Sequence, residues 1–114
     1  MRNIRLIALD LDGTLLTTDK RLTERSRKAL ERAASSGIYI VPTTGRFYNA
    51  MPLSVRELPF LRYAITINGA CVESIGTGEV LYHAEIPRDT ALGLWRFWIP
   101  IPSSMTAICA PRPL

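Results

Sequence analysis

The sequence has few of the residues that form disulfide scaffolds or metal clusters. Among its 114 residues are two cysteines, Cys71 and Cys109, and one histidine, His83. The cysteines lack the close spacing of metal ligands, so we expect free thiols in a reducing cytoplasm. His83 lies in an apolar segment that predicts a strand, and we expect it at the surface without a catalytic role.

Long apolar runs and basic blocks are absent as well. No segment approaches the roughly 18 consecutive apolar residues that a membrane-spanning helix needs. The apolar N-terminal stretch is interrupted by Asp10 and Asp12, which excludes the core of a signal peptide. The net charge of +4 comes from basic residues scattered through segments such as 21–32, without interleaved aromatic residues. We therefore expect a cytoplasmic protein that binds neither membranes nor nucleic acids.

The residues that are present predict an α/β fold. Hydrophobic residues make up 47% and charged residues 21% of the chain, which is a globular composition. Thr23 can cap a helix that Gly37 ends, and this helix lies between two apolar strands. Such a crossover makes the strands parallel and brings their carboxyl ends to one edge of the sheet. The predicted elements are strands at 4–9, 38–41 and 63–67, helices at 23–36 and around 49–57, and a hairpin with strands at 71–73 and 80–82.

Two carboxylates, Asp10 and Asp12, directly follow the first predicted strand. A carboxylate at this position can attack phosphorus or hold a hard cation, and a second one on the same side can move a proton. An EF-hand is excluded because Leu15 occupies the position where its calcium loop needs glycine. Two other interpretations stay open for an isolated acid pair, namely a site for a metal-bound nucleotide sugar and a simple strand-end turn.

Two polar segments follow the second and third predicted strands. Thr43 to Arg46 comes after the second strand, and Asn68 with Gly69 comes after the third. Each segment could be a plain turn, but the parallel arrangement predicts that the first lies close to Asp10. Arg46 could assist an anion or form a structural ion pair, and the sequence leaves both roles open.

The segment Asp10 to Leu16, with the apolar strand before it, resembles motif I of the haloacid dehalogenase (HAD) superfamily. The segment Thr66 to Ala70 is similar to the Cof-type subgroup of these phosphatases. The resemblance implies the first three strands of a Rossmann-like parallel sheet, then a β-hairpin and the start of an α/β cap. It divides the chain into the N-terminal part of the core domain at 1–86, the start of the cap at 87–98, and a divergent proline-rich tail at 99–114.

The resemblance also implies a mechanism and a set of site residues. The activity would be Mg²⁺-dependent hydrolysis of a small phosphate monoester, such as a sugar or cofactor phosphate, through an aspartyl-phosphate. Asp10 would be the nucleophile and Asp12 the proton-transfer group. Mg²⁺ would be held by the Asp10 carboxylate and the backbone carbonyl of Asp12. The substrate-binding residues would be Thr44, Gly45, Arg46 and Asn68.

Two parts that the family resemblance leads us to expect are missing from the sequence. These are a charge-shielding lysine beyond the cap and a Gly-Asp-x-x-x-Asp loop after a fourth strand, and the lysines here are Lys20 and Lys28. We therefore predict a truncated chain that is inactive alone and whose first strand is an open sheet edge. The alternatives are a phosphomutase and a non-catalytic remnant or module that binds phosphate or a partner.

Overall fold

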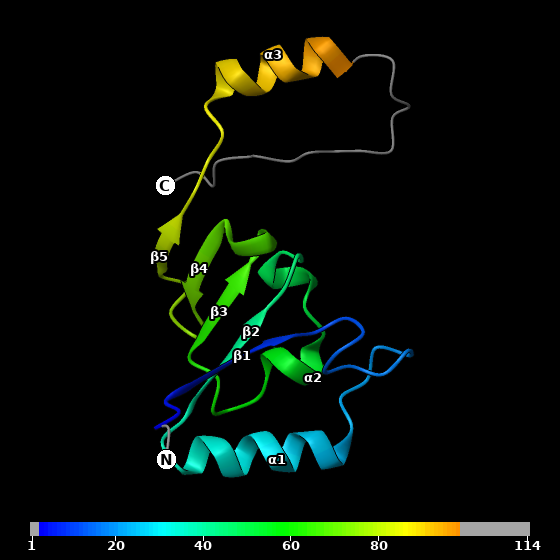
Figure 1. Cartoon of the computed structure of the whole chain (residues 1–114), viewed down its shortest axis with the longest axis vertical. Helices are drawn as coiled ribbons and strands as arrows, with labels where there is room; N and C mark the ends of the chain where they lie inside the picture. Colours follow the sequence, from blue (N-terminus) through cyan, green and yellow to red (C-terminus); the bar gives the residue numbers. More distant parts are fainter. Residues whose placement is uncertain (1–2, 99–114) are drawn as a thin grey trace. The chain divides into compact units, whose positions relative to one another are not determined.

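The computed structural model describes residues 3–98 of the chain. These residues belong to two units, one ending at His83 and one beginning at Ala84 (Figure 1). The predicted tail at 99–114 and Cys109 lie outside the described residues. The elements are β1 (Leu6–Asp10), α1 (Glu24–Ser35), β2 (Tyr39–Thr43), η1 (Tyr48–Ala50), α2 (Leu53–Arg56), β3 (Tyr63–Thr66), η2 (Ile67–Gly69), β4 (Cys71–Ser74), β5 (Val80–His83) and α3 (Arg88–Trp98).

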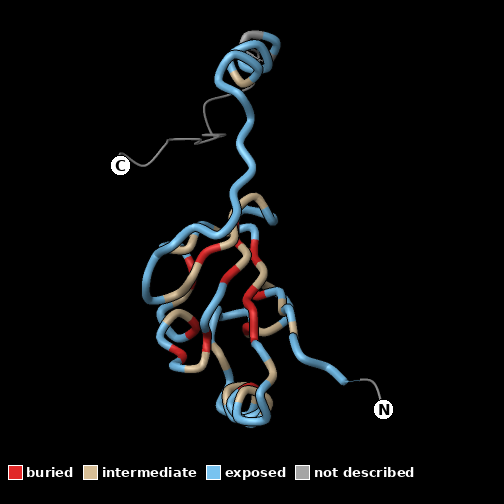
Figure 2. Tube along the Cα trace, turned by 90° about the vertical axis from the view of Figure 1, so that its left-hand side faces the viewer, coloured by how far each residue is buried: buried red, intermediate tan, exposed pale blue. Residues whose placement is uncertain are grey.

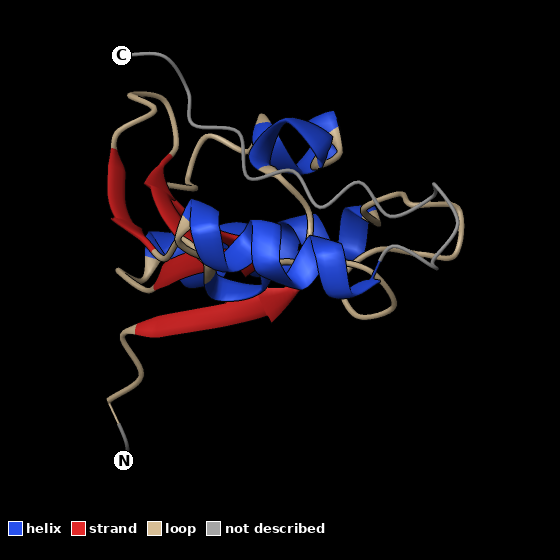
Figure 3. Ribbon diagram, turned by 90° about the horizontal axis from the view of Figure 1, so that it is seen from above, coloured by secondary structure: helices blue, strands red, loops and turns tan. Residues whose placement is uncertain are grey.

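The first unit is built on a five-stranded sheet in which the strands follow one another in sequence order. β1, β2 and β3 are parallel, and β3, β4 and β5 are antiparallel neighbours. Helices and strands are both present (Figure 3), which confirms the predicted α/β class. The antiparallel pairing of β4 with β5 confirms the predicted hairpin. Among the described residues β1 pairs with β2 alone, so it forms the open edge that the sequence predicted. Cys71 in β4 is a free thiol and His83 in β5 is exposed, as expected.

α1 begins and ends where the sequence predicts. The side chain of Thr23 accepts a hydrogen bond from the backbone N–H of Ser26, and Gly37 follows the helix with a φ of +82°. Leu30 is buried on the inner face, whereas Arg25 and Lys28 are exposed. Because the first turn leaves N–H groups without helical partners, the Thr23 cap fixes where this crossover helix starts.

Glu24 in the first turn of α1 makes the folding stability of the chain depend on pH. Hydrogen bonds from Arg27 lower the pKa of Glu24 to about 2. Since the pKa is lower in the folded chain, the stabilisation is present above the unfolded pKa of about 4.5 and is lost as the pH falls toward 2. We expect Glu24→Gln to lower the thermal midpoint slightly at pH 7, and the difference from wild type to shrink between pH 5 and 3. A difference that does not change with pH would contradict this account.

The predicted helix around 49–57 is wrong as a single element. The structure has the short 3-10 helix η1 and the separate four-residue helix α2. Met51 between them is extended, with φ −70° and ψ 141°, because the ring of Pro52 disfavours a helical conformation at the residue before it. Pro52 then precedes the first turn of α2, where a missing N–H costs nothing.

The core of the first unit lies between α1, α2 and the sheet. Buried residues are concentrated in the inner strands and the adjoining loops (Figure 2). Leu11 and Leu16 enter this core from the loop after β1, so the backbone that carries both aspartates is anchored by apolar packing. β1 is an apolar strand at the edge of the described sheet, and its Leu6 is exposed.

The second unit contains α3, which begins at Arg88. Its apolar side chains are exposed in the described structure, including Leu92, Leu94, Trp95 and Phe97. In residues 3–98 no helix combines the length and apolar character needed to cross a bilayer.

Candidate functional site

The carboxyl ends of β1, β2 and β3 bring the three predicted polar segments together. Asp10 pairs in register with Thr43, and Thr43 pairs with Ile65. The loop after β3 is also tied to the loop after β2, because the backbone N–H of Asn68 donates to the carbonyl of Thr44 at 3.1 Å. The segments after β1, β2 and β3 therefore lie together at one edge of the sheet, as the parallel arrangement predicts.

Asp10 presents an accessible carboxylate at the end of β1. One oxygen, Oδ2, accepts a hydrogen bond from the hydroxyl of Thr14 at 3.0 Å. No basic side chain among the described residues forms an ion pair with Asp10. The loop turns away after it through Gly13, whose φ of +81° lies in the region that favours glycine. The second carboxylate oxygen can therefore meet a cation or an electrophile from solvent.

Asp12 is held very differently from Asp10. Arg46 forms a bidentate pair with it, with Nε 2.7 Å from Oδ2 and Nη2 2.9 Å from Oδ1. Lys20 adds a third contact, with Nζ 2.8 Å from Oδ1. The hydrogen bonds from Arg46, and then those from Lys20, hold the pKa of Asp12 well below its usual range. Asp12 is therefore ionised, and of the two roles left open for Arg46 the structure contains the ion pair.

Sequence reasoning did not identify Lys20 as part of this site. The residue belongs to a compact turn in which Lys20 N–H donates to the Thr17 carbonyl and Thr17 N–H donates to the Arg21 carbonyl, both at 2.9 Å. Bridges of Leu16 with Asp12 and with Leu22 fold the loop back over the strand end. The polar run 17–21 between Leu16 and Leu22 is typical of a loop, but nothing in the sequence indicates where its lysine points.

The loop after β2 supplies Thr44 and Gly45. The Thr44 side chain is buried, and its oxygen accepts a hydrogen bond from the backbone N–H of Arg46 at 3.1 Å. Gly45 lies against Asn68, and a Cβ at position 45 would be 2.8 Å from Asn68 Oδ1. Asn68 has a left-handed backbone with φ 53° and ψ 32°. A side chain at position 45 would therefore require the Asn68 side chain to move.

The donor atoms at this edge fit Mg²⁺ in part. Carboxylate and carbonyl oxygens are the ligands that Mg²⁺ prefers. The Asp10 carboxylate and the Asp12 backbone carbonyl are such donors, whereas the Asp12 carboxylate is occupied by Arg46 and Lys20. Within residues 3–98 no group of three or more Asp, Glu, His or Cys side chains is placed to hold a metal ion.

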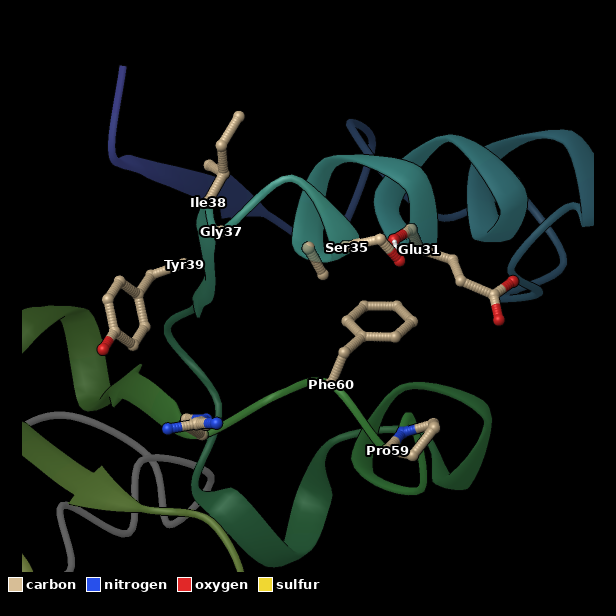
Figure 4. Close-up of a pocket in the computed structure, with 9 residues that line it drawn as sticks. Glu31, Ser35, Gly37, Ile38, Tyr39, Pro59 and Phe60 are labelled. Atoms are coloured by element: carbon tan, nitrogen blue, oxygen red, sulfur yellow. Dashed lines mark hydrogen bonds between the residues drawn. The ribbon is translucent and has the colours of Figure 1, made fainter. Parts of the chain in front are cut away.

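A separate cavity lies near the start of β2, at the end of the strand away from Asp10. It has a volume of about 470 Å³, and the rings of Tyr39 and Phe60 border it near the end of α1 (Figure 4). Because Thr43 and Thr44 lie at the opposite end of β2, this cavity is not part of the site around the two aspartates.

Comparison with known proteins identifies the family. Residues 7–98 match the family model of haloacid dehalogenase-like hydrolases. The chain belongs to this family. A HAD-like hydrolase from B. subtilis of known structure has a TM-score of 0.73 and 30% identity, over 85% of this chain and 34% of that one. A HAD subclass IIB sugar phosphatase has a TM-score of 0.70 and 29% identity, over 84% and 37% of the two chains.

Curated relatives of this HAD-like chain carry phosphatase names. The HMP-PP phosphatase of Shigella flexneri is 38% identical over 95 residues, covering 82% of this chain and 35% of the relative. A 5-amino-6-(5-phospho-D-ribitylamino)uracil phosphatase of Bacillus subtilis is 37% identical over 68 residues, covering 60% and 27%. The chain thus spans about a third of the length of the relatives it matches.

Proposed function

We propose that this chain supplies the nucleophile and the phosphate-binding loop of a Mg²⁺-dependent phosphatase acting on small phosphate monoesters. The observation that carries the proposal is the contrast between the two aspartates at the end of β1. Asp10 is exposed and has an open carboxylate oxygen. Asp12, two residues later in the sequence, is fixed by Arg46. The phosphatase names of the relatives support this reaction class.

In the proposed reaction Asp10 attacks the phosphorus of the ester. A bond forms between a carboxylate oxygen of Asp10 and phosphorus, and the bond from phosphorus to the ester oxygen breaks. Asp12 is ionised in its pair with Arg46 and Lys20, so it must first take up a proton when substrate binds. It then gives this proton to the departing alkoxide and takes one from the water that hydrolyses the aspartyl-phosphate. The result is the free alcohol, inorganic phosphate and the original Asp10 carboxylate.

The loops after β2 and β3 would bind the phosphoryl group. The Thr44 hydroxyl uses its oxygen as an acceptor from Arg46 N–H, which leaves its own O–H available to a phosphoryl oxygen. Gly45, Arg46 and Asn68 line the same strand ends and are proposed as substrate-binding residues. The proposed substrate is a small phosphorylated metabolite, such as a sugar or cofactor phosphate. The proposed location is the cytoplasm.

Mg²⁺ is the proposed cofactor. The Asp10 carboxylate and the backbone carbonyl of Asp12 would hold it, and the ion when bound neutralises charge on the phosphoryl group. Because these residues offer one open carboxylate, Mg²⁺ binding by this segment alone should be weak. We place the core segment at 1–86 and the start of a cap at 87–98.

We further propose that the 114 residues alone have no turnover. The family resemblance leads us to expect a charge-shielding lysine and the acids of a Gly-Asp-x-x-x-Asp loop, and these 114 residues contain neither. Losing one such fixed charge typically costs about 3 kcal/mol of transition-state stabilisation. Arg46 and Lys20 keep Asp12 ionised, and an ionised Asp12 has no proton to give. This favours a second candidate function, a phosphate- or partner-binding module without turnover.

Two proteins test the proposal, the 114-residue chain and a chimera in which the matching 82% of this chain replaces the aligned segment of the Shigella flexneri HMP-PP phosphatase. We expect the chimera to hydrolyse an aryl phosphate with Mg²⁺, to lose activity in EDTA and to regain it when Mg²⁺ is added back. The chain alone should stay at background. A chimera that is folded by circular dichroism but inactive would contradict the phosphatase assignment, whereas turnover by the chain alone would contradict its inactivity.

A further inference from the structure

Three donors from two different loops converge on the carboxylate of Asp12. Lys20 comes from the loop after β1, and Arg46 from the loop after β2. The Lys20 contact at 2.8 Å is as short as those from Arg46, and both reach Oδ1. A bidentate guanidinium already fixes the plane of a carboxylate, so a third charged donor on the same oxygen fixes its rotation further.

The backbone at Lys20 is arranged for this contact. Lys20 has a φ of +60°, a left-handed conformation that is unfavourable for a residue with a side chain. The turn around it compensates for that cost, because Thr17 accepts from Lys20 N–H through its carbonyl and from Arg21 N–H through its hydroxyl. An unfavourable backbone conformation that is maintained by its surroundings is characteristic of functional positions.

Arg46 is anchored independently of Asp12. Its Nη1 donates to the carbonyl of Ala50 at 3.0 Å, so the guanidinium is held from both sides. Lys20, in contrast, is about half exposed, and within residues 3–98 its ammonium group contacts Asp12 alone. The two cations therefore differ: Arg46 joins Asp12 to the loop after β2, and Lys20 joins it to its own turn.

We infer that Lys20 is a positioning residue that, with Arg46, fixes the side chain of Asp12 next to the Asp10 nucleophile. This inference rests on the proposed function, since a fixed Asp12 matters where it transfers protons for Asp10. Lys20 acts through Asp12 and does not itself move a proton. A fixed carboxylate spends more of its time in the geometry that allows proton transfer. Fixing it therefore affects the rate of the chemical step more than the affinity for substrate.

The contact itself is tested in the 114-residue chain, without any activity. Thermal midpoints are measured for wild type, Lys20→Met, Asp12→Asn and the double variant. We expect Lys20→Met to lower the midpoint by a few degrees in wild type and to have no effect in the Asp12→Asn background. Lys28→Met is the control, because Lys28 lies on the surface of α1 near Glu24. Additive losses for Lys20 and Asp12 would overturn the contact.

The positioning role is tested in the chimera. We expect Lys20→Met to lower kcat about 10-fold with KM within twofold of wild type, and Lys20→Arg to recover most of kcat. Lys28→Met should leave both constants unchanged. Wild-type kcat in Lys20→Met would overturn the positioning role and leave the phosphatase assignment intact. An inactive chimera, combined with non-additive midpoints in the 114-residue chain, would instead refute the proposed function while the contact stands.

Discussion

Asp10→Asn is expected to reduce Mg²⁺-dependent hydrolysis of an aryl phosphate by the chimera by at least about 100-fold. The neutral amide is a poor nucleophile and a weaker ligand for a hard cation, so both proposed roles of the Asp10 carboxylate are lost. The fold should be unaffected because Asp10 is exposed and its side chain accepts one hydrogen bond, from Thr14. Activity is measured as the initial rate at saturating substrate, and the fold of each variant is checked by circular dichroism.

Asp19→Asn is the matched control for this experiment. Asp19 is an aspartate in the same loop region, but it is exposed and forms a long ion pair of 3.5 Å with Arg21. It should keep wild-type activity because exposed pairs of this kind contribute little. Full activity in Asp10→Asn would remove the nucleophile assignment, and equal losses in the two variants would indicate a general electrostatic effect.

Leu11→Ala is expected to lower the free energy of unfolding by about 2–5 kcal/mol, the range for truncating a buried leucine. Leu11 lies between the two aspartates in sequence, yet its side chain has 0% exposure and packs in the core of the first unit. The lost atoms would leave a cavity in the core that Leu11 shares with residues such as Ile40 of β2 and Val55 of α2. A domain of this size should then melt at least roughly 8 °C lower.

Leu53→Ala provides the comparison for the core prediction. Leu53 in α2 is 58% exposed, and alanine is a good helix former, so the midpoint should change little. Urea unfolding monitored by circular dichroism gives both free energies. Similar midpoints for Leu11→Ala and wild type would mean that the core does not anchor the loop after β1, which would contradict the anchored backbone at the two aspartates.

The parallel sheet could be predicted because its signals are local. Each strand is a short apolar run, and Thr23 and Gly37 mark the ends of the helix between the first two. The handedness of such a unit then places Asp10 and Thr44 at the same edge without further information. Met51 shows the limit of this reasoning, since the effect of Pro52 on the preceding residue divides a segment whose overall pattern is helical.

The side-chain partners could not be predicted in the same way. The sequence left Arg46 with two roles, because a guanidinium pairs equally well with a phosphate or a carboxylate. The choice of Asp12 depends on a loop 34 residues away in sequence, and on the carbonyl of Ala50 that holds the other side of the guanidinium. The approach of Asn68 to Gly45 is likewise a contact between two loops.

The sequence was sufficient to predict the α/β class, the order of the strands and the position of the aspartates at a strand end. These features follow from apolar spacing, capping residues and turn residues, whose effects extend over a few positions. The tertiary structure alone decided that Asp12 is clamped by Lys20 and Arg46 while Asp10 stays open. This difference arises because packing of the loops fixes which charged groups meet, and electrostatic attraction has no preference for one partner until the chain has folded.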